Sequence, residues 1–409
     1  MSDNDTTRRT EEPTRRDYVK YGGAVVGGGL LAGCSANTES DSTTTEPSAE
    51  TETESGTASS TETNTPYETC IEPVGCLTFE EVPETWMALS GPWADMAIAL
   101  GQRDGFKPAG WYAPGYFYEQ VGVEWLTDTE AAYADGKWEA EVFYELDPNV
   151  ILGDPNYLTA FDSSWDESDT RELVETVGPV FGNNIVRRRE FHTYELYSLY
   201  EAFDRLADFF RERERYEAFA AIHAEMQAEI QSRLPAERER PEIGLVNFGS
   251  SPGEGTFYPM TVSGEGVEMK QYRDLGMTSA FSSETVAGGE IDYEQLLEVD
   301  PELIVIHSGV RLSTDDGTFD GQAFVDQFVT PTLEHPVGGQ LTAAKEGNIY
   351  PGGSFQQGPI VNLFQTELAA RQLVPEEFGE FDPQQFPEIP EDEQLFDRQR
   401  VADIINGEF

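Results

Sequence analysis

The sequence contains very little positive charge. Among its 409 residues there are 26 lysines and arginines against 77 aspartates and glutamates, and only five of these cations are lysines. The net charge of −51 repels a phosphate backbone, which excludes ordinary nucleic-acid binding. Abundant carboxylate with little lysine keeps a protein hydrated at very high salt, where screening shortens self-repulsion to a few ångströms. We therefore expect a halophilic protein.

The signatures of common enzymes and metal sites are missing as well. There is no glycine-rich phosphate loop, no HExxH motif and no nucleophile elbow. A zinc receptor needs several convergent histidines, but the four present are scattered along the chain: His192, His223, His307 and His335. These absences favour a protein without a cofactor or metal of its own and without enzymatic activity, with zinc capture left as an alternative.

The apolar run near the N-terminus is too short to span a membrane. Residues 22–31 supply about ten apolar or glycine positions, where a spanning helix needs about twenty. The run follows Arg15-Arg16 and precedes Leu31-Ala32-Gly33-Cys34. The first pattern resembles a twin-arginine export signal and the second a lipobox, in which the cysteine is lipidated. Residues 1–34 are thus expected to be an export signal that leaves a lipid anchor on Cys34, a disordered tail with chance motifs being the alternative.

A polar stretch separates this signal from the rest of the chain. Residues 35–69 carry eight acidic residues and no basic one, with almost no apolar side chain to bury. We therefore expect a solvated tether over residues 35–76. Cys70 and Cys76 are the only cysteines left, and an exported protein favours a small disulfide loop between them. Two free buried thiols are the alternative.

From residue 77 onward, short apolar runs alternate with helical patterns, which predicts a parallel α/β sheet. The expected strands are 86–89, 150–152, 243–248, 303–306 and 349–350. A repeat supports two related lobes. Residues 140–152 (AEVFYELDPNVIL) and 293–305 (YEQLLEVDPELIV) each place a helix before Asp-Pro and a buried strand after it. Proline cannot continue the helix and holds the residue before it extended.

A long helical region lies between the two copies. Leu199, Phe203, Leu206 and Phe210 step by three and four, which gives one apolar face. A second helix follows and stops at Leu234-Pro235, and its nineteen or so residues would span about 30 Å. We expect an N-terminal lobe over 77–213, a connector helix over 214–237, and a C-terminal lobe over 238–409.

From residue 79 to residue 409, the chain resembles the solute-binding proteins of ABC importers with a single helical backbone. These proteins capture ferric siderophores, haem or cobalamin. The resemblance rests on Ala88–Gly101, on both Asp-Pro repeats, on Gly178-Pro179-Val180 and on Ala343–Tyr350. It implies an α/β fold of two Rossmann-like three-layer lobes joined by one connector helix, with a ligand cleft between them. Residues 105–140 are longer and more aromatic than that family's loop, which bears on the identity of the ligand.

The resemblance also implies a function. A monomeric, haloarchaeal-type, lipid-anchored receptor would bind a metal chelate at the outer face of the cytoplasmic membrane and pass it to an ABC permease with its ATPase. A ferric siderophore is the first expectation, with cobalamin or haem next and a surface-anchored enzyme on the same fold as the rival. In this family, one glutamate on each lobe docks on the permease, and the matching positions here are Glu141 and Glu294.

The expected ligand contacts follow the strand ends, because ligands of open α/β sheets collect there. They are Trp93, Trp111, Tyr112, Tyr157, Tyr258, His307, Arg311 and Tyr350, and Asp154 and Phe355 also follow predicted strands. Arg188, in the triplet Arg187-Arg188-Arg189, is the expected anion contact, since a guanidinium matches carboxylates and anionic chelates. The plainer alternatives are surface ion pairs for the arginines and core packing for the aromatics.

Overall fold

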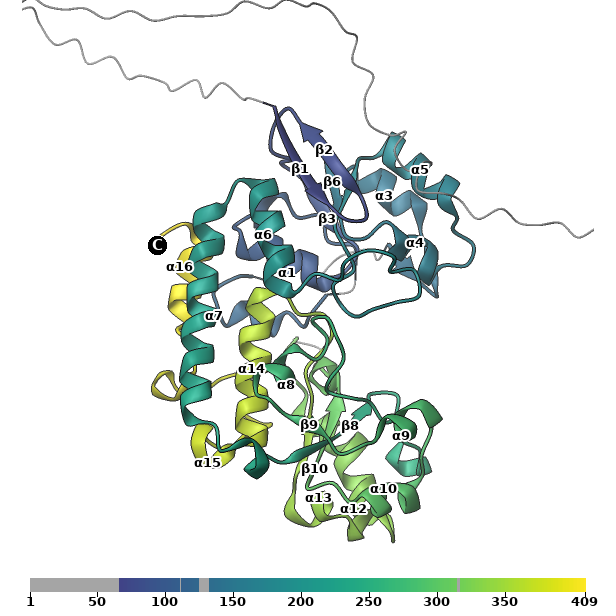
Figure 1. Cartoon of the computed structure of the whole chain (residues 1–409), viewed down its shortest axis with the longest axis vertical. Helices are drawn as coiled ribbons and strands as arrows, with labels where there is room; N and C mark the ends of the chain where they lie inside the picture. The colour runs from purple at the N-terminus through teal and green to yellow at the C-terminus, as the bar shows by residue number, and fades with distance from the viewer. Residues whose placement is uncertain (1–65, 111, 125–131, 315–316) are drawn as a thin grey trace, which may run out of the picture.

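The computed structural model describes residues 66–110, 112–124, 132–314 and 317–409 (Figure 1). The predicted export signal, the lipidation site Cys34 and the expected ligand contact Trp111 lie outside these residues. The described chain forms two α/β lobes, one above the other in Figure 1, with long helices along one side. Within the described ranges, no helix is both long enough and apolar enough to cross a bilayer.

The N-terminal lobe is built on a three-stranded parallel sheet. Its strands are β3 (Trp86–Ala88), β6 (Val150–Leu152) and β7 (Val180–Phe181), in the order β3-β6-β7, and every residue in them is buried. Burial on both faces explains the uninterrupted apolar runs in the sequence. The helices of this lobe are α1 (Gly91–Ala99), α2 (Tyr116–Glu119), α3 (Ala140–Leu146), α4 (Asn156–Phe161) and α5 (Glu167–Thr176), and a small hairpin adds β4 (Tyr133–Ala134) and β5 (Lys137–Trp138).

The C-terminal lobe has a four-stranded parallel sheet. The strands β8 (Glu242–Asn247), β9 (Thr278–Ser279), β10 (Leu303–His307) and β11 (Ile349–Pro351) take the order β11-β10-β8-β9. The helices of this lobe are α8 (Lys270–Asp274), α9 (Ser283–Gly288), α10 (Tyr293–Val299), α11 (Gly321–Phe324), α12 (Thr330–Glu334) and α13 (Thr342–Glu346), with a π-helical stretch at Val325–Val329. Short 3-10 turns lie at Arg103–Gly105, Glu237–Glu239, Pro252–Glu254, Gly309–Arg311, Gly338–Gln340 and Glu391–Glu393.

The sequence repeat corresponds to the same local structure in both lobes. Helices α3 and α10 each have seven residues and end on an aspartate, Asp147 at φ 43° and Asp300 at φ 44°. Both aspartates take the left-handed conformation that ends the helix, so the prediction that the residue before proline is extended is wrong here. A proline follows each aspartate, and the next strand, β6 or β10, lies in the sheet of its lobe. The fold prediction of two α/β lobes with parallel sheets is therefore confirmed.

Two long helices join the lobes. Helix α7 (Arg213–Arg233) has 21 residues, about 32 Å at the α-helical rise. It follows α6 (Leu199–Phe210) and runs beside α14 (Pro359–Leu373) in Figure 1. Helix α14 is buried along its whole length and contacts α1 and α2 of one lobe and α8 of the other. The core is consequently continuous through both lobes, which holds them at a fixed angle.

Both ends of the folded body differ from the predicted boundaries. Helix α16 (Arg398–Asn406), which follows the short α15 (Pro375–Phe378), packs against α1 and α7, so the prediction that residues 238–409 form only the second lobe does not hold there. The tether prediction does not hold from Tyr67 onward, since β1 (Tyr67–Ile71) and β2 (Gly75–Phe79) form a hairpin on α6. The Tyr67 hydroxyl donates to the Phe209 carbonyl at 2.7 Å.

Candidate functional site

One loop of the N-terminal lobe reaches across to the C-terminal lobe. This arginine loop, residues 182–198, follows β7 and carries the triplet Arg187-Arg188-Arg189. The carbonyls of Ile185 and Val186 accept hydrogen bonds from the amides of Val267 and Glu268, at 2.9 and 3.1 Å. These backbone contacts join the loop that follows β7 to the segment that precedes α8, so the two lobes meet here.

A buried ion-pair chain lies at this crossing. An Arg187 guanidinium nitrogen is 3.4 Å from one carboxylate oxygen of Glu268, and the other oxygen is 3.3 Å from Nε2 of His307. Glu268 is 5% exposed and His307 is 2% exposed, whereas Arg187 is exposed. Burial acts to raise the pKa of Glu268, but His307, Arg187 and Arg189 together hold that pKa below its ordinary value. The ionised carboxylate thus links a surface cation to a buried imidazole.

The second arginine of the site, Arg189, lies against aromatic rings. Its guanidinium carbon is 5.1 Å from the ring centre of Phe161, which in turn lies 4.2 Å from the ring of Tyr157. No carboxylate among the described residues forms an ion pair with Arg189, and its Nε is buried without a hydrogen-bond partner there. Burial, helped by the nearby Arg187, lowers the pKa of Arg189. This cation therefore retains donors for an incoming acceptor.

Tyr157 and Phe161 also line a small pocket whose other walls are mostly apolar. The remaining lining residues are Leu89, Gly110, Tyr133, Trp138 and Gln356. Burial raises the pKa of Tyr157 to about 12 although Arg189 and Arg187 act to lower it, so the phenol is neutral at ordinary pH. The pocket offers rigid aromatic surface, with a cationic loop beside it.

Of the predicted contacts, Tyr157 and His307 lie in this site, and Arg188 does not. Arg188 points away and pairs with Glu265 at 3.0 Å on an exposed surface. Arg188 therefore lies apart from the group formed by Arg187, Glu268 and His307.

Three of the predicted contacts are packing residues in this structure. Trp93 is fully buried on α1 and donates from its indole nitrogen to the Asn183 carbonyl at 2.7 Å. The Tyr112 hydroxyl donates to the Ala88 carbonyl at 3.1 Å. Tyr350 directs its hydroxyl to Asn348, 3.0 Å away. These side chains direct their polar atoms to partners within the fold, which is the packing role given above as the plainer alternative.

The remaining predicted positions divide between surface and scaffold. Tyr258 is 39% exposed beyond the end of β8, and Arg311 is exposed with its guanidinium 5.7 Å from the ring centre of Phe248. Phe355 is partly buried and packs against the core. Asp154 is buried and accepts a hydrogen bond from the Asn184 amide at 2.8 Å, so it supports the arginine loop.

Several residues of the site have no simple sequence signal. Glu268 follows no predicted strand, and Phe161 ends a short helix. Their places depend on how the lobes meet. The arginine triplet alone marked the loop, because unpaired arginine is uncommon in so acidic a chain.

The predicted docking glutamates occupy equivalent places on different lobes. Glu141 lies in the first turn of α3 and Glu294 in the first turn of α10, and both are exposed. Each is therefore accessible to a partner that spans the two lobes.

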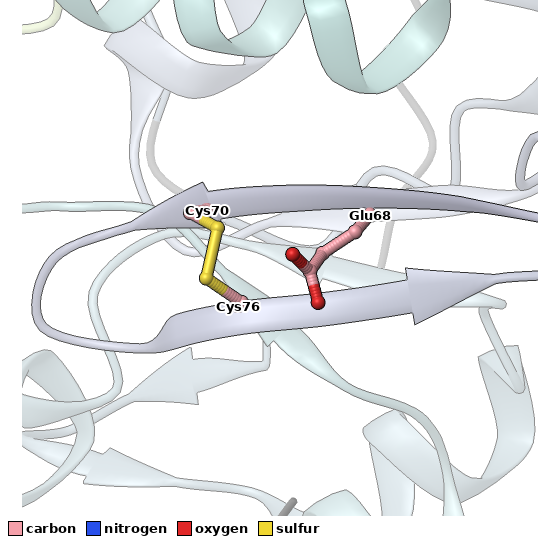
Figure 2. Close-up of side chains that lie close together, drawn as sticks. All are labelled: Glu68, Cys70 and Cys76. Carbon is pink, nitrogen blue, oxygen red and sulfur yellow. A yellow bond between two sulfur atoms is a disulfide. The ribbon is translucent and has the colours of Figure 1, made fainter. Parts of the chain in front are cut away.

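One further group resembles a metal site. Glu68 lies beside Cys70 and Cys76 on the exposed hairpin (Figure 2). The two cysteines form a disulfide across paired positions of β1 and β2. A disulfide has no thiolate to bind a metal, so this group is not a metal site. The two cysteines instead close the hairpin covalently.

Comparison with known proteins identifies the fold. An iron-uptake ABC transporter substrate-binding protein, PiuA of Streptococcus pneumoniae, superposes with a TM-score of 0.52 at 15% identity, covering 76% of this chain and 99% of that one. A periplasmic binding protein from Veillonella parvula gives a TM-score of 0.53 at 15% identity, covering 78% and 94%. No curated protein is similar enough in sequence to match.

The family assignment comes from sequence. Residues 88–354, well over half of the chain, match the family described as periplasmic binding protein. This range contains both sheets, the arginine loop and the connector helix. The chain therefore belongs to the periplasmic binding protein family and is a solute-binding component of transport rather than an enzyme.

Proposed function

We propose that the protein is a lipid-anchored receptor that captures an anionic metal chelate, a ferric siderophore, and delivers it to an ABC permease. The observation that carries this proposal is the placement of Arg187 and Arg189 at the crossing of the two lobes. A pair of cations concentrated at one point of a chain with net charge −51 favours an anionic ligand there.

The charge balance of the site supports an anion. Glu268 pairs with Arg187 and also contacts His307, so it does not neutralise both Arg187 and Arg189. Arg189 has no carboxylate partner among the residues described. Ferric complexes of catecholate or carboxylate chelators are anionic, and a guanidinium donates charge-assisted hydrogen bonds to their oxygens.

Aromatic surface beside the arginine loop supports a chelate rather than a bare anion, and the pocket itself is too small to enclose one. Tyr157 and Phe161 offer rigid ring faces for the organic part of such a ligand, next to the guanidinium of Arg189. The similarity to the pneumococcal iron-uptake protein is a likeness of fold, and agrees with a receptor of this kind. Because α14 and α7 hold the lobes, we expect a small rocking motion on binding.

The first experiment is a titration of the chain carrying Cys34→Ser in molar KCl, followed by tryptophan fluorescence. Ferric tris-catecholate, ferric tris-hydroxamate, haem and cyanocobalamin are tested in turn, and 1:1 binding of an anionic ferric chelate is expected. Arg189→Gln should weaken that binding at least tenfold, as for the loss of a charged hydrogen bond. Its matched control, Arg188→Gln, alters the neighbouring arginine that faces away, and should change the affinity little.

The outcomes separate the alternatives. Binding of haem or cobalamin alone would show that one of these, and not a ferric siderophore, is the ligand of the receptor. A folded protein that binds none of the four would refute the chelate proposal. Equal losses in the Arg188 and Arg189 variants would show that the arginine loop does not form the site.

Delivery and anchoring are tested in cells. Glu141→Lys with Glu294→Lys should abolish chelate uptake while binding by the purified protein stays intact. The matched control, Glu145→Lys with Glu298→Lys, reverses exposed charges on the same two helices and should keep uptake. Cys34→Ala should release the protein from the membrane fraction, and retention there would contradict a lipid anchor at this residue.

A further inference from the structure

A histidine within the arginine loop holds the backbone that carries Arg189. The backbone amide of Arg189 donates to Nδ1 of His192 at 2.8 Å, and Nε2 of His192 lies 2.9 Å from the carbonyl oxygen of Asn184. The imidazole therefore bridges two points of its own loop, one at the start of the loop and one at the functional arginine.

These two contacts fix the tautomer of the ring. A backbone amide is only a donor, so Nδ1 must be the unprotonated acceptor. A carbonyl oxygen is only an acceptor, so Nε2 must carry the proton. Both hydrogen bonds therefore require neutral His192 in its Nε2–H form. A second proton would sit on Nδ1 and face the Arg189 amide, donor against donor.

We propose that His192 is a positioning residue for Arg189, and that its protonation releases this arginine and weakens ligand binding. The inference rests on the proposed function, in which Arg189 contacts the ligand. A receptor built this way binds its chelate tightly at neutral pH and less tightly in acid, through a change in loop geometry.

The rest of the loop is held independently of His192, so the change is local. Asp154 accepts hydrogen bonds from the Asn184 amide and from the Tyr194 hydroxyl. The side-chain amide of Asn183 donates to the carbonyl of Glu72, in the turn of the disulfide-closed hairpin, at 2.8 Å. Loss of the ring contact thus leaves Arg189 held locally by one hydrogen bond, from the His192 amide to the Arg189 carbonyl at 3.1 Å, while both ends of the loop stay attached.

The groups around His192 are few. The ring of Phe191 stacks on it at 4.9 Å, and the ring of Tyr194, which is bonded to Asp154, lies 5.0 Å away. Arg189 and Glu190 are its charged neighbours along the loop. His307 is the second histidine of the site, and its Nε2 lies 3.3 Å from Glu268. A test must therefore separate the two histidines.

The test compares His192→Asn with the parent chain between about pH 5 and pH 8. The Oδ1 atom of asparagine can accept from the Arg189 amide, as Nδ1 does, but it does not titrate in this range. The probe is a ferric tris-hydroxamate bearing a sulfonate, whose charge is constant over these pH values. The parent should lose about fivefold more affinity than His192→Asn on acidification, which corresponds to one lost hydrogen bond.

A second measurement needs no ligand. Nitrogen-15 shifts of the His192 ring should show the Nε2–H tautomer at pH 7.5, and the Arg189 amide proton should move upfield as the ring protonates. His335→Asn is the matched control, since His335 lies in the C-terminal lobe stacked on Tyr293, and its binding profile should follow that of the parent.

Two failures are distinguishable. If the parent binds the sulfonated ferric chelate at no pH, the proposed function is wrong for this ligand class. The nitrogen-15 shifts of the ring and the amide proton shift of Arg189 then test the tautomer of His192 and its hydrogen bond to Arg189. If the parent binds but His192→Asn shows the same pH profile, the positioning role is refuted while the receptor stands. An Nδ1–H tautomer at neutral pH would also refute the positioning role.

Discussion

The buried carboxyl of Asp95 makes the strongest prediction about stability. Asp95 lies on α1, is 0% exposed, and accepts hydrogen bonds from the backbone amides of Gly358 and Val361 at 2.7 and 3.1 Å. These amides belong to the first turn of α14, so the contact joins the N-terminal lobe to the helix shared by both lobes. Burial raises its pKa to about 7, although these hydrogen bonds and the Tyr118 hydroxyl act to lower it.

The sign of the pH dependence follows from this shift. The folded state holds the proton up to about pH 7, whereas the unfolded chain releases it near pH 3.8. The folded state therefore binds more protons between these values, and the free energy of unfolding falls as the pH rises through this window. A gap of about three pH units at about 1.4 kcal/mol each gives a loss of about 4 kcal/mol at pH 8.

Asp95→Asn should remove this loss, because the amide oxygen can still accept from Gly358 and Val361 and carries no charge. The assay is denaturant unfolding in molar KCl from about pH 4 to pH 8, where exposed charges are screened. The difference between Asp95→Asn and the parent should be near zero at about pH 4, rise with a slope near 1.4 kcal/mol per pH unit, and level off above about pH 7. Asp104→Asn, an exposed control, should leave the parent profile in place. A difference that is independent of pH, or that favours the parent at pH 8, would refute the assignment.

Three further predictions concern stability. Glu367→Gln should cost about 3 kcal/mol in the free energy of unfolding, because it leaves the buried Arg398 guanidinium without its partner 3.2 Å away. Replacing Cys70 and Cys76 by serine should cost about 2 kcal/mol, the loop entropy for a sequence separation of 6, measured as a lower denaturation midpoint. Phe203→Ala should cost about 4 kcal/mol, since the ring is fully buried against α7.

Each of these has an internal control. Glu225→Gln breaks an exposed pair between α7 and Arg400, which lies on α16 as Arg398 does, and its cost should be below about 1 kcal/mol. A loss as large as that of Glu367→Gln would contradict the burial argument. Reductant should lower the midpoint of the parent to that of the double serine variant, and a further fall in the variant would mean that the disulfide is not the cause. A Phe203→Leu variant should recover most of the loss from Phe203→Ala, or the cavity argument fails.

Much of the fold could be predicted from local patterns. The strands at 150–152 and 303–307 follow Asp-Pro, which ends a helix and begins an extended segment in both lobes. The apolar stripe on α6 and the stop at Leu234-Pro235 likewise depend on neighbouring residues only. Short strands such as β7 and β9, with two residues each, were missed because so few residues carry no periodicity.

The candidate site was harder to predict. Tyr157 and His307 follow strands and lie near the arginine loop, but Trp93 also follows a strand and lies in the core. An aromatic residue at a strand end can face a ligand or fill the space under the next helix. Its position after the strand is the same in both cases, so the sequence does not distinguish the two roles. The local sequence does not indicate which way each side chain of the arginine triplet points, so it does not distinguish Arg188 from its neighbours.

The amino-acid sequence alone determined the chemistry and the architecture of this protein: an acidic, two-lobed α/β chain with long connecting helices and an arginine triplet. These properties depend on composition and on patterns within about twenty residues of sequence. They do not require any contact between distant parts of the chain. The tertiary structure decided which arginines meet Glu268 and His307, and that Asp95 lies against α14. It also decided that the last helix returns to the first lobe. Each of these contacts joins residues far apart in the chain, and only the packing of the two lobes on α7 and α14 brings them together.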